Sequence, residues 1–231
     1  MNEQRTHIDL FSGIGGFALA ANAAGFRTSV FCEQDDYCAK VLRRHWPNVP
    51  IIPDVKEFDG TRWKGADLLT GGFPCQPFSN AGLKLGKEDN DRYLWPEMFR
   101  VIKEARPRFV LAENVTPLIR LAIDEVLSDL GSEGYTTGTV VLPACALNAP
   151  HRRPRCWILA HSNSERGCGW KRERKYAADA GEPSGSPELR QWDTEPAVGR
   201  VAHGIPHRTH RLKALGNSIV PQVAYEILKL I

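Results

Sequence analysis

The sequence predicts an α/β protein with a doubly wound, mostly parallel, Rossmann-like sheet that carries helices on both faces. Short apolar runs typical of buried strands alternate along the chain with amphipathic helical stretches, which is the pattern of successive βαβ units. A glycine-rich turn, Gly13-x-Gly15-x-x-Ala18, follows the first expected strand, and Glu33 comes 20 residues after Gly13. This spacing matches the nucleotide-binding βαβ fingerprint, in which the acid accepts hydrogen bonds from ribose hydroxyls.

The first third of the chain supplies the elements around this turn. Asp35 is expected to cap a helix, because its carboxylate can accept from amides of the first turn. Gly25 is expected to end the preceding helix, and residues 55–65 read as a polar connection. The expected strands are 6–11, 28–32 and 66–70, with a short extended stretch at 47–53, and the expected helices are 16–24 and 35–46.

The remaining chain continues the alternation and then changes in composition. Residues 80–92 form a long polar run, and loops of this kind are often lids; simple disorder is the alternative. Residues 161–204 are rich in Gly, Ser, Pro and charge, and we expect a surface or partly disordered insert there, with order returning at 212. The expected helices are 94–105, 116–130 and 222–230, and the expected strands are 108–112, 134–143 and 155–160.

Composition indicates a soluble globular protein with a basic region. Of 231 residues, 42% are hydrophobic and 25% charged, which is ordinary for a globular domain. Six cysteines without any CxxC pair favour a reduced, cytoplasmic protein. Four glycines break the apolar run 8–26 too often for a membrane span. Residues 151–213 hold 13 Lys and Arg against 7 Asp and Glu, which points to a polyanionic partner; a solvated basic surface is the alternative.

One thiol stands on a constrained loop. The expected strand 66–70 leads into Gly71-Gly72-Phe73-Pro74-Cys75-Gln76-Pro77, where glycine and proline exclude regular structure. Open α/β sheets bind ligands at this carboxyl edge. A thiol held there suits a nucleophile, although loop cysteines can also be packed and inert. Glu113 follows the next expected strand and reaches the same edge; a strand-end carboxylate paired with arginine is the alternative for it.

Four stretches together resemble the C5-cytosine DNA methyltransferase family, over about residues 6–160 and 205–231. They are Asp9-Leu10-Phe11-Ser12-Gly13-Ile14-Gly15-Gly16, Pro74-Cys75-Gln76, Glu113-Asn114-Val115 and Gly216-Asn217-Ser218. The resemblance implies a methyltransferase catalytic domain built from residues 1–160 and 205–231. Residues 161–204 would then be a reduced target-recognition insert.

The resemblance also implies S-adenosylmethionine as cofactor. The residues that it assigns to the cofactor are Phe11, Gly13, Ile14, Gly15, Glu33, Gln34, Asp54, Val55, Pro74, Asn217 and Ser218. Glu33 would hold the ribose, and Gln34 with Asp54 and Val55 would contact the adenine. Asn217 and Ser218 would close the pocket.

For catalysis the resemblance implies attack by Cys75 on C6 of a flipped-out cytosine in double-stranded DNA. Glu113, with a raised pKa, would serve N3 of the base. Arg155, and less directly Arg153, would face O2 and the phosphate. His151 stands where the family commonly has Gln, and Pro154 separates the two arginines.

Several alternatives stay open at this point. Only 60 residues separate Arg155 from Gly216, so recognition could fall to residues 170–176, to residues 200–211, or to a partner subunit of a non-catalytic protein. The histidines in 200–211 lack carboxylate or cysteine neighbours at ligand spacing, so we expect no metal. The same chemistry could act on RNA. A nicotinamide oxidoreductase would leave Pro74-Cys75-Gln76 without a role. Restriction–modification, mobile-element protection and regulation all fit as biological roles.

Overall fold

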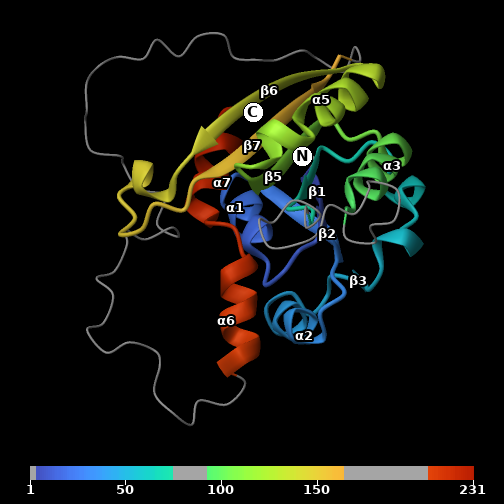
Figure 1. Cartoon of the computed structure of the whole chain (residues 1–231). Helices are drawn as coiled ribbons and strands as arrows, with labels where there is room; N and C mark the ends of the chain where they lie inside the picture. Colours follow the sequence, from blue (N-terminus) through green and yellow to red (C-terminus); the bar gives the residue numbers. More distant parts are fainter. Residues whose placement is uncertain (1–3, 75–92, 164–207) are drawn as a thin grey trace.

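One seven-stranded sheet organises the protein (Figure 1). The computed structural model describes residues 4–74, 93–163 and 208–231. The sheet order is β3-β2-β1-β4-β5-β7-β6; β1 to β5 pair in parallel, and β7 is antiparallel to both β5 and β6. The strands are β1 (Arg5–Leu10), β2 (Phe26–Cys32), β3 (Ile51–Ile52), β4 (Leu68–Gly71), β5 (Phe109–Val115), β6 (Tyr135–Leu142) and β7 (Arg155–Ser162).

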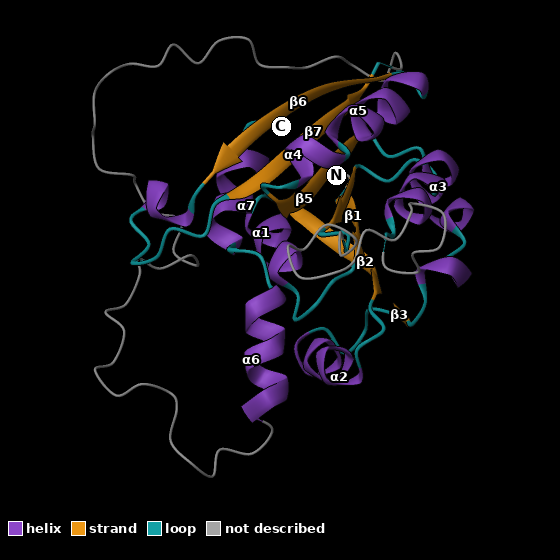
Figure 2. Ribbon diagram, viewed as in Figure 1, coloured by secondary structure: helices purple, strands orange, loops and turns teal. Residues whose placement is uncertain are grey.

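Helices cover both faces of the sheet (Figure 2). Apolar residues of α3, α4 and α5 join one core with the strands, and apolar residues of α1 and α7 join a second core on the opposite face. The predicted doubly wound class is therefore confirmed. The helices are α1 (Gly16–Ala23), α2 (Asp36–His45), α3 (Trp95–Ala105), α4 (Leu118–Leu121), α5 (Ile123–Ser132), α6 (Arg208–Asn217) and α7 (Pro221–Leu228), with short 3₁₀ turns η1 (Val55–Glu57), η2 (Gly60–Trp63) and η5 (Ala144–Leu147).

The central strand β1 is buried on both faces. Ile8 and Leu10 are fully buried, and so are the polar His7 and Asp9 between them. The His7 ring bonds through Nε2 to the Thr70 hydroxyl at 2.8 Å, and that hydroxyl donates to Asp9 Oδ1 at 3.0 Å. Burial lowers the pKa of His7 to about 3 and raises the pKa of Asp9 well above its ordinary value. Such buried polar groups are tolerated because they bond to one another, and here they tie β1 to β4.

The predicted helix signals are confirmed where they rest on capping chemistry. The Asp35 carboxylate accepts from the amides of Tyr37 at 3.0 Å and Cys38 at 3.2 Å, so it caps α2. Gly25 has a φ of 86° just after α1, a left-handed conformation that glycine adopts without cost.

Four expectations differ from the structure. The connection 55–65 forms η1 and η2, because Phe58 is buried and anchors it to the core. The helix expected at 116–130 divides at Ala122, whose φ of −153° leaves the helical region. Order returns with α6 at Arg208 rather than at 212, and strand β5 runs on to Val115 rather than ending at 112.

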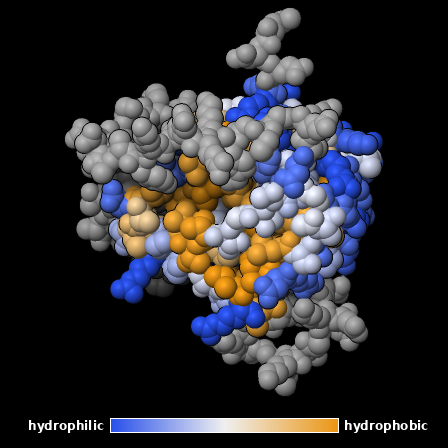
Figure 3. Space-filling model, turned by 90° about the horizontal axis from the view of Figure 1, so that it is seen from above, coloured by the Kyte–Doolittle hydropathy of each residue, from blue (hydrophilic) through white to orange (hydrophobic). Residues whose placement is uncertain are grey.

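The edge strand β6 is exposed at its centre. Val140 and Val141 are 44% and 43% accessible, and Figure 3 shows a broad apolar area on the face seen from above.

Among the residues that the structure describes, no helix has the length and apolar character needed to cross a membrane.

Candidate active site

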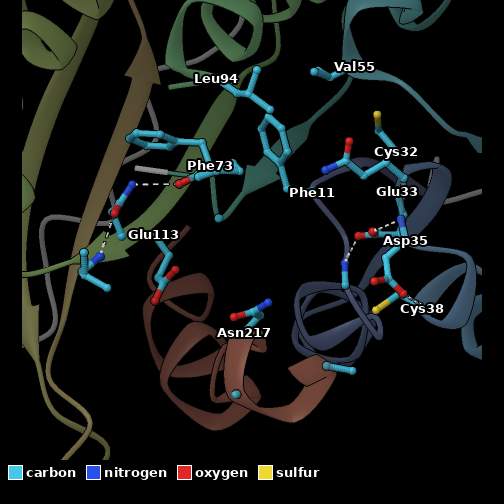
Figure 4. A pocket seen from close by; sticks show the side chains of 18 of the residues that line it. Phe11, Cys32, Glu33, Asp35, Cys38, Val55, Phe73, Leu94, Glu113 and Asn217 are labelled. Carbon is cyan, nitrogen blue, oxygen red and sulfur yellow. Dashed lines mark hydrogen bonds between the residues drawn. The ribbon is translucent and has the colours of Figure 1, made fainter. Parts of the chain in front are cut away.

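A cavity of about 870 Å³ opens where the parallel strands end. Its walls include residues that directly follow β1, β2, β3 and β4, together with the last residues of β5. Parallel strands present their carboxyl ends at one sheet edge, so residues distant in sequence meet there. The arginine segment before β7 and the end of α6 complete the wall. Figure 4 shows side chains from these elements around the same space.

Glu33, just beyond β2, forms one side of the cavity. Its Oε2 accepts from the Gly13 amide at 2.6 Å, and its Oε1 accepts from the Asp35 amide at 2.7 Å. Burial raises the pKa of Glu33 above its ordinary value, and the two backbone donors oppose that rise. Both oxygens are held in fixed positions and keep further lone pairs, so Glu33 can accept hydrogen bonds from hydroxyl groups of a ligand.

Glycine is needed for different reasons at the three glycine positions of the turn after β1. Gly13 lines the cavity with a φ of 56°, and a Cβ there would meet nothing within 4 Å. At Gly15 a Cβ would lie 2.6 Å from the ring of Trp46, and at Gly16 one would lie 2.8 Å from Ile219. Only Gly13 therefore fits the expectation that glycine lets a ligand approach; the other two admit neighbouring side chains. Phe11, which also lines the cavity, has a left-handed φ of 53°.

Glu113 forms the opposite side of the cavity, at the end of β5. Its Oε1 lies 2.9 Å from Nε of Arg155, the first residue of the neighbouring strand β7. Burial raises the pKa of Glu113 from its ordinary value of 4.5 to about 7, and the charges of Arg155 and Arg153 oppose that rise. A carboxyl group poised near neutrality can hold or give up a proton at physiological pH.

Asn114 ties the cysteine loop to β5, a function that the sequence did not suggest. Its side-chain amide donates to the Phe73 carbonyl at 2.9 Å, and its carbonyl oxygen accepts from the Val115 amide at 2.8 Å. Phe73 lies two residues before Cys75. The sequence feature that could have indicated this role is a polar residue directly after Glu113 in an otherwise apolar strand. Asn114 is only 4% exposed, so its side chain needs partners within the protein.

The structure brings most of the predicted site residues to this cavity. Cys75, and the run 80–92 expected to be a lid, lie outside the described residues, whereas Pro74 lines the cavity. Ile14, Gly15 and Ser218 do not line it; Ser218 lines a smaller adjoining hollow with His151 and Ile219. The predicted residues that line it are Phe11, Gly13, Glu33, Gln34, Asp54, Val55, Pro74, Glu113, Arg153, Arg155 and Asn217.

Helix α6 also contributes a residue that sequence reasoning missed. Lys213 lines the cavity, and its Nζ lies 2.9 Å from Asp35 Oδ2. These residues are 178 positions apart, and no local pattern links them. Figure 1 shows α6 beside α2, and Asp35 is the N-cap residue of α2.

Comparison with known sequences gives a consistent family. A sequence model described as C-5 cytosine-specific DNA methylase matches residues 5–195. The chain is 42% identical over 161 residues to the Type II methyltransferase M.PspPI of Psychrobacter sp.. It is 37% identical over 171 residues to the Type II methyltransferase M.Eco47II of Escherichia coli. These alignments cover 66% and 70% of this chain but 38% and 40% of the two relatives, so the chain spans well under half of their length.

A solved structure shares the fold. A crystal structure of a DNMT2 mutant from Spodoptera frugiperda superposes with a TM-score of 0.60 over 74% of this chain and 53% of that chain. Sequence identity is 18%, so this likeness concerns the arrangement of the sheet and helices alone.

Proposed function

This chain belongs to the family of C-5 cytosine-specific DNA methylases, and on that premise we propose that it transfers a methyl group from S-adenosylmethionine to C5 of a cytosine in DNA. The observation that carries the proposal is that Glu33 and Glu113, on the ends of β2 and β5, open into one cavity. Glu33, which can accept hydrogen bonds from hydroxyl groups, and Glu113, which can transfer a proton, thus line the same cavity.

The cofactor side of the cavity fits a nucleoside. Glu33 offers fixed acceptor oxygens for a ribose, Gly13 leaves open space beside them, and Phe11 and Val55 add apolar wall. A cavity of about 870 Å³ lies in the range typical of small-molecule sites. When bound, S-adenosylmethionine supplies an electrophilic methyl group on its sulfonium.

The other side of the cavity suits an extruded pyrimidine. Cys75 is the proposed nucleophile: its thiolate forms a bond to C6, and the displaced electron density moves towards N3 and O2. Glu113, protonated near neutral pH, meets N3, and Arg155 offsets negative charge beside O2. Once C5 carries the methyl group, a base removes the C5 proton, and the electron pair of that C–H bond re-forms the ring double bond and expels the thiolate. The cytosine must leave the duplex for this contact.

Methylation in cells tests the proposal directly. The chain is expressed in a host that lacks cytosine methylation, and plasmid DNA and total RNA are bisulfite-sequenced beside Cys75→Ser. We expect protected cytosines in the plasmid only, and none with the variant. Protection of RNA alone would replace DNA by RNA as substrate. No protection, with the cofactor still bound in a calorimetric titration, would favour a protein that depends on a partner subunit for target recognition.

Covalent trapping tests the nucleophile. A duplex that carries 5-fluorocytosine at the methylated position cannot lose fluorine as a cation, so the adduct should persist. We expect a protein–DNA band that survives denaturing gel electrophoresis with the wild-type chain. An equal band with Cys75→Ala would remove Cys75 from the mechanism.

A further inference from the structure

Arg153 contacts the backbone of a distant segment. Its Nη2 donates to the Gly216 carbonyl at 2.8 Å and to the Ser218 carbonyl at 2.5 Å. Gly216 lies in the last turn of α6, and Ser218 directly follows the helix. Carbonyls at a helix end lack intrahelical donors and carry the negative end of the helix dipole. A guanidinium group satisfies both needs, so Arg153 caps α6 from 63 residues away.

The backbone of Arg153 is adapted to this contact. Its φ is 37°, a left-handed value that residues other than glycine adopt rarely and at a cost. Such strain persists where surrounding contacts compensate for it, and the two carbonyl bonds are contacts of this kind. Arg155, two residues later, turns instead to Glu113. The two arginines therefore have different partners.

The end of α6 that Arg153 holds forms part of the cavity wall. Asn217, between the two bonded carbonyls, lines the cavity, and Figure 4 shows its side chain directed into that space. The next segment packs on α1, since Ile219 Cγ1 would lie only 2.8 Å from a Cβ at Gly16. The segment at the capped end of α6 therefore both lines the cavity and packs against the glycine-rich turn.

The same helix is attached on the cofactor side as well. Lys213 pairs with Asp35 at 2.9 Å, and Asp35 donates its amide to Glu33. The α6 helix therefore spans the cavity from the Glu33 side to the Arg153 side. Its ion pair with Asp35 is solvent-exposed at Lys213, whose side chain is 64% accessible, and exposed pairs contribute little. Arg153 makes two charge-assisted bonds, and the one to Ser218 is partly buried, so Arg153 provides the more extensive attachment.

We propose that Arg153 is a positioning residue that fixes the end of α6, and with it Asn217, over the cofactor side of the cavity. It acts through the helix and does not touch the base. The part of this inference that concerns S-adenosylmethionine rests on the proposed function; the attachment of α6 does not.

Arg153→Met tests the inference, because methionine keeps an apolar stem and removes all donors. Arg106→Met is the control: Arg106 is also left-handed, with a φ of 46°, and outside the cavity wall it bonds to the Glu133 carbonyl at 3.2 Å and to the Glu133 carboxylate at 2.6 Å. The measurements are hydrogen exchange of residues 212–223 in the free chain and calorimetric titration with S-adenosylmethionine. For Arg153→Met we expect faster exchange and a cofactor Kd raised about 10- to 100-fold, as for loss of charge-assisted hydrogen bonds. Arg106→Met should change neither.

The outcomes separate the two proposals. If the wild-type chain binds no cofactor, the proposed function fails, and the exchange measurement alone still decides the attachment. If Arg153→Met exchanges and binds cofactor like the wild type but loses turnover at saturating cofactor, Arg153 acts on the base or through its charge on Glu113, and the inference is overturned. If Arg153→Met does not fold, Arg153→Lys takes its place. A cofactor Kd between that of the wild type and the range expected for Arg153→Met supports the attachment of α6 by Arg153, and a wild-type cofactor Kd with reduced turnover contradicts it.

Discussion

The two carboxyl groups of the cavity have contrasting surroundings. Glu33 is held through both oxygens by backbone amides of Gly13 and Asp35, whereas Glu113 is held by the side chain of Arg155. Burial raises the pKa of each group, at Glu113 to about 7. Backbone amides stabilise the ionised form from fixed positions. An arginine side chain can instead turn to another acceptor when a substrate arrives.

The contrast implies a division of labour. Glu33 is suited to remain an acceptor throughout, because neutral, immobile donors define its geometry. Glu113 is suited to change its protonation state, because its burial favours the neutral form and its partner is a separate side chain.

Glu113→Gln should produce the largest effect. Glutamine can still donate a hydrogen bond but cannot transfer a proton, so turnover at saturating cofactor should fall by about 10²- to 10⁴-fold, the usual contribution of a proton-transferring group. Cofactor affinity should be unchanged. Single-turnover methylation and a calorimetric titration measure the two quantities. A parallel loss of cofactor affinity would show that the two sides of the cavity are not separate.

Glu33→Gln should produce the opposite pattern at a smaller scale. One amide oxygen replaces two carboxylate oxygens, so the Gly13 or Asp35 amide would face a donor instead of an acceptor. We expect the cofactor Kd to rise about 10- to 100-fold, the range for loss of hydrogen bonds to a charged group, with turnover at saturating cofactor retained. A fall in turnover without a change in Kd would move Glu33 to the catalytic side.

Local sequence patterns were enough to predict which residues lie at the carboxyl edge of the sheet. The apolar runs that end at Leu10, Cys32 and Gly71 are local patterns, and parallel pairing brings their carboxyl ends together. Glu33 and Glu113 could therefore be assigned to one edge from their positions after apolar runs. The antiparallel placement of β7 between β5 and β6, which brings Arg155 to Glu113, has no local signal.

Long-range contacts account for what the sequence could not indicate. The need for glycine at position 15 comes from Trp46, the residue directly after α2, and the capping of α6 comes from Arg153. Neither partner can be inferred from neighbouring residues. Helix α6 itself has few buried side chains, so its sequence lacks the apolar periodicity by which helices are recognised.

The titration of Glu113 should appear in the stability of the folded chain. In the folded state its carboxyl keeps its proton up to about pH 7, against an ordinary pKa of 4.5. Between those values the folded state holds the extra proton, so this group makes the free energy of unfolding fall as pH rises, by about 3 kcal/mol in total. Urea unfolding between pH 4.5 and 8 should show the wild type losing stability relative to Glu113→Gln over that range.

The free energy of unfolding must be compared between the wild type and Glu113→Gln, because His7 also makes it depend on pH. Its pKa is lowered to about 3 from 6.5 by burial, so its contribution is lost as pH falls through that window and opposes the Glu113 slope. Since His7 is unchanged in Glu113→Gln, the difference between the two proteins isolates Glu113. A difference that does not vary with pH would place the pKa of Glu113 in the ordinary range.

Gly72→Ala should give the smallest effect and the finest test of the contrast. A Cβ at Gly72 would lie 3.2 Å from Glu113 Oε2 and 4.0 Å from Phe17. At 3.2 Å the carboxyl must shift slightly to admit the methyl group. The methyl group would then remove solvent from the carboxyl, so the pKa of Glu113 should rise and the pH profile of turnover should move to higher pH. Cofactor affinity should stay the same, because Glu33 is not affected. Gly138→Ala on β6, where a Cβ meets nothing within 4 Å, is the control, and an equal displacement of its profile would show that Gly72 does not act through Glu113.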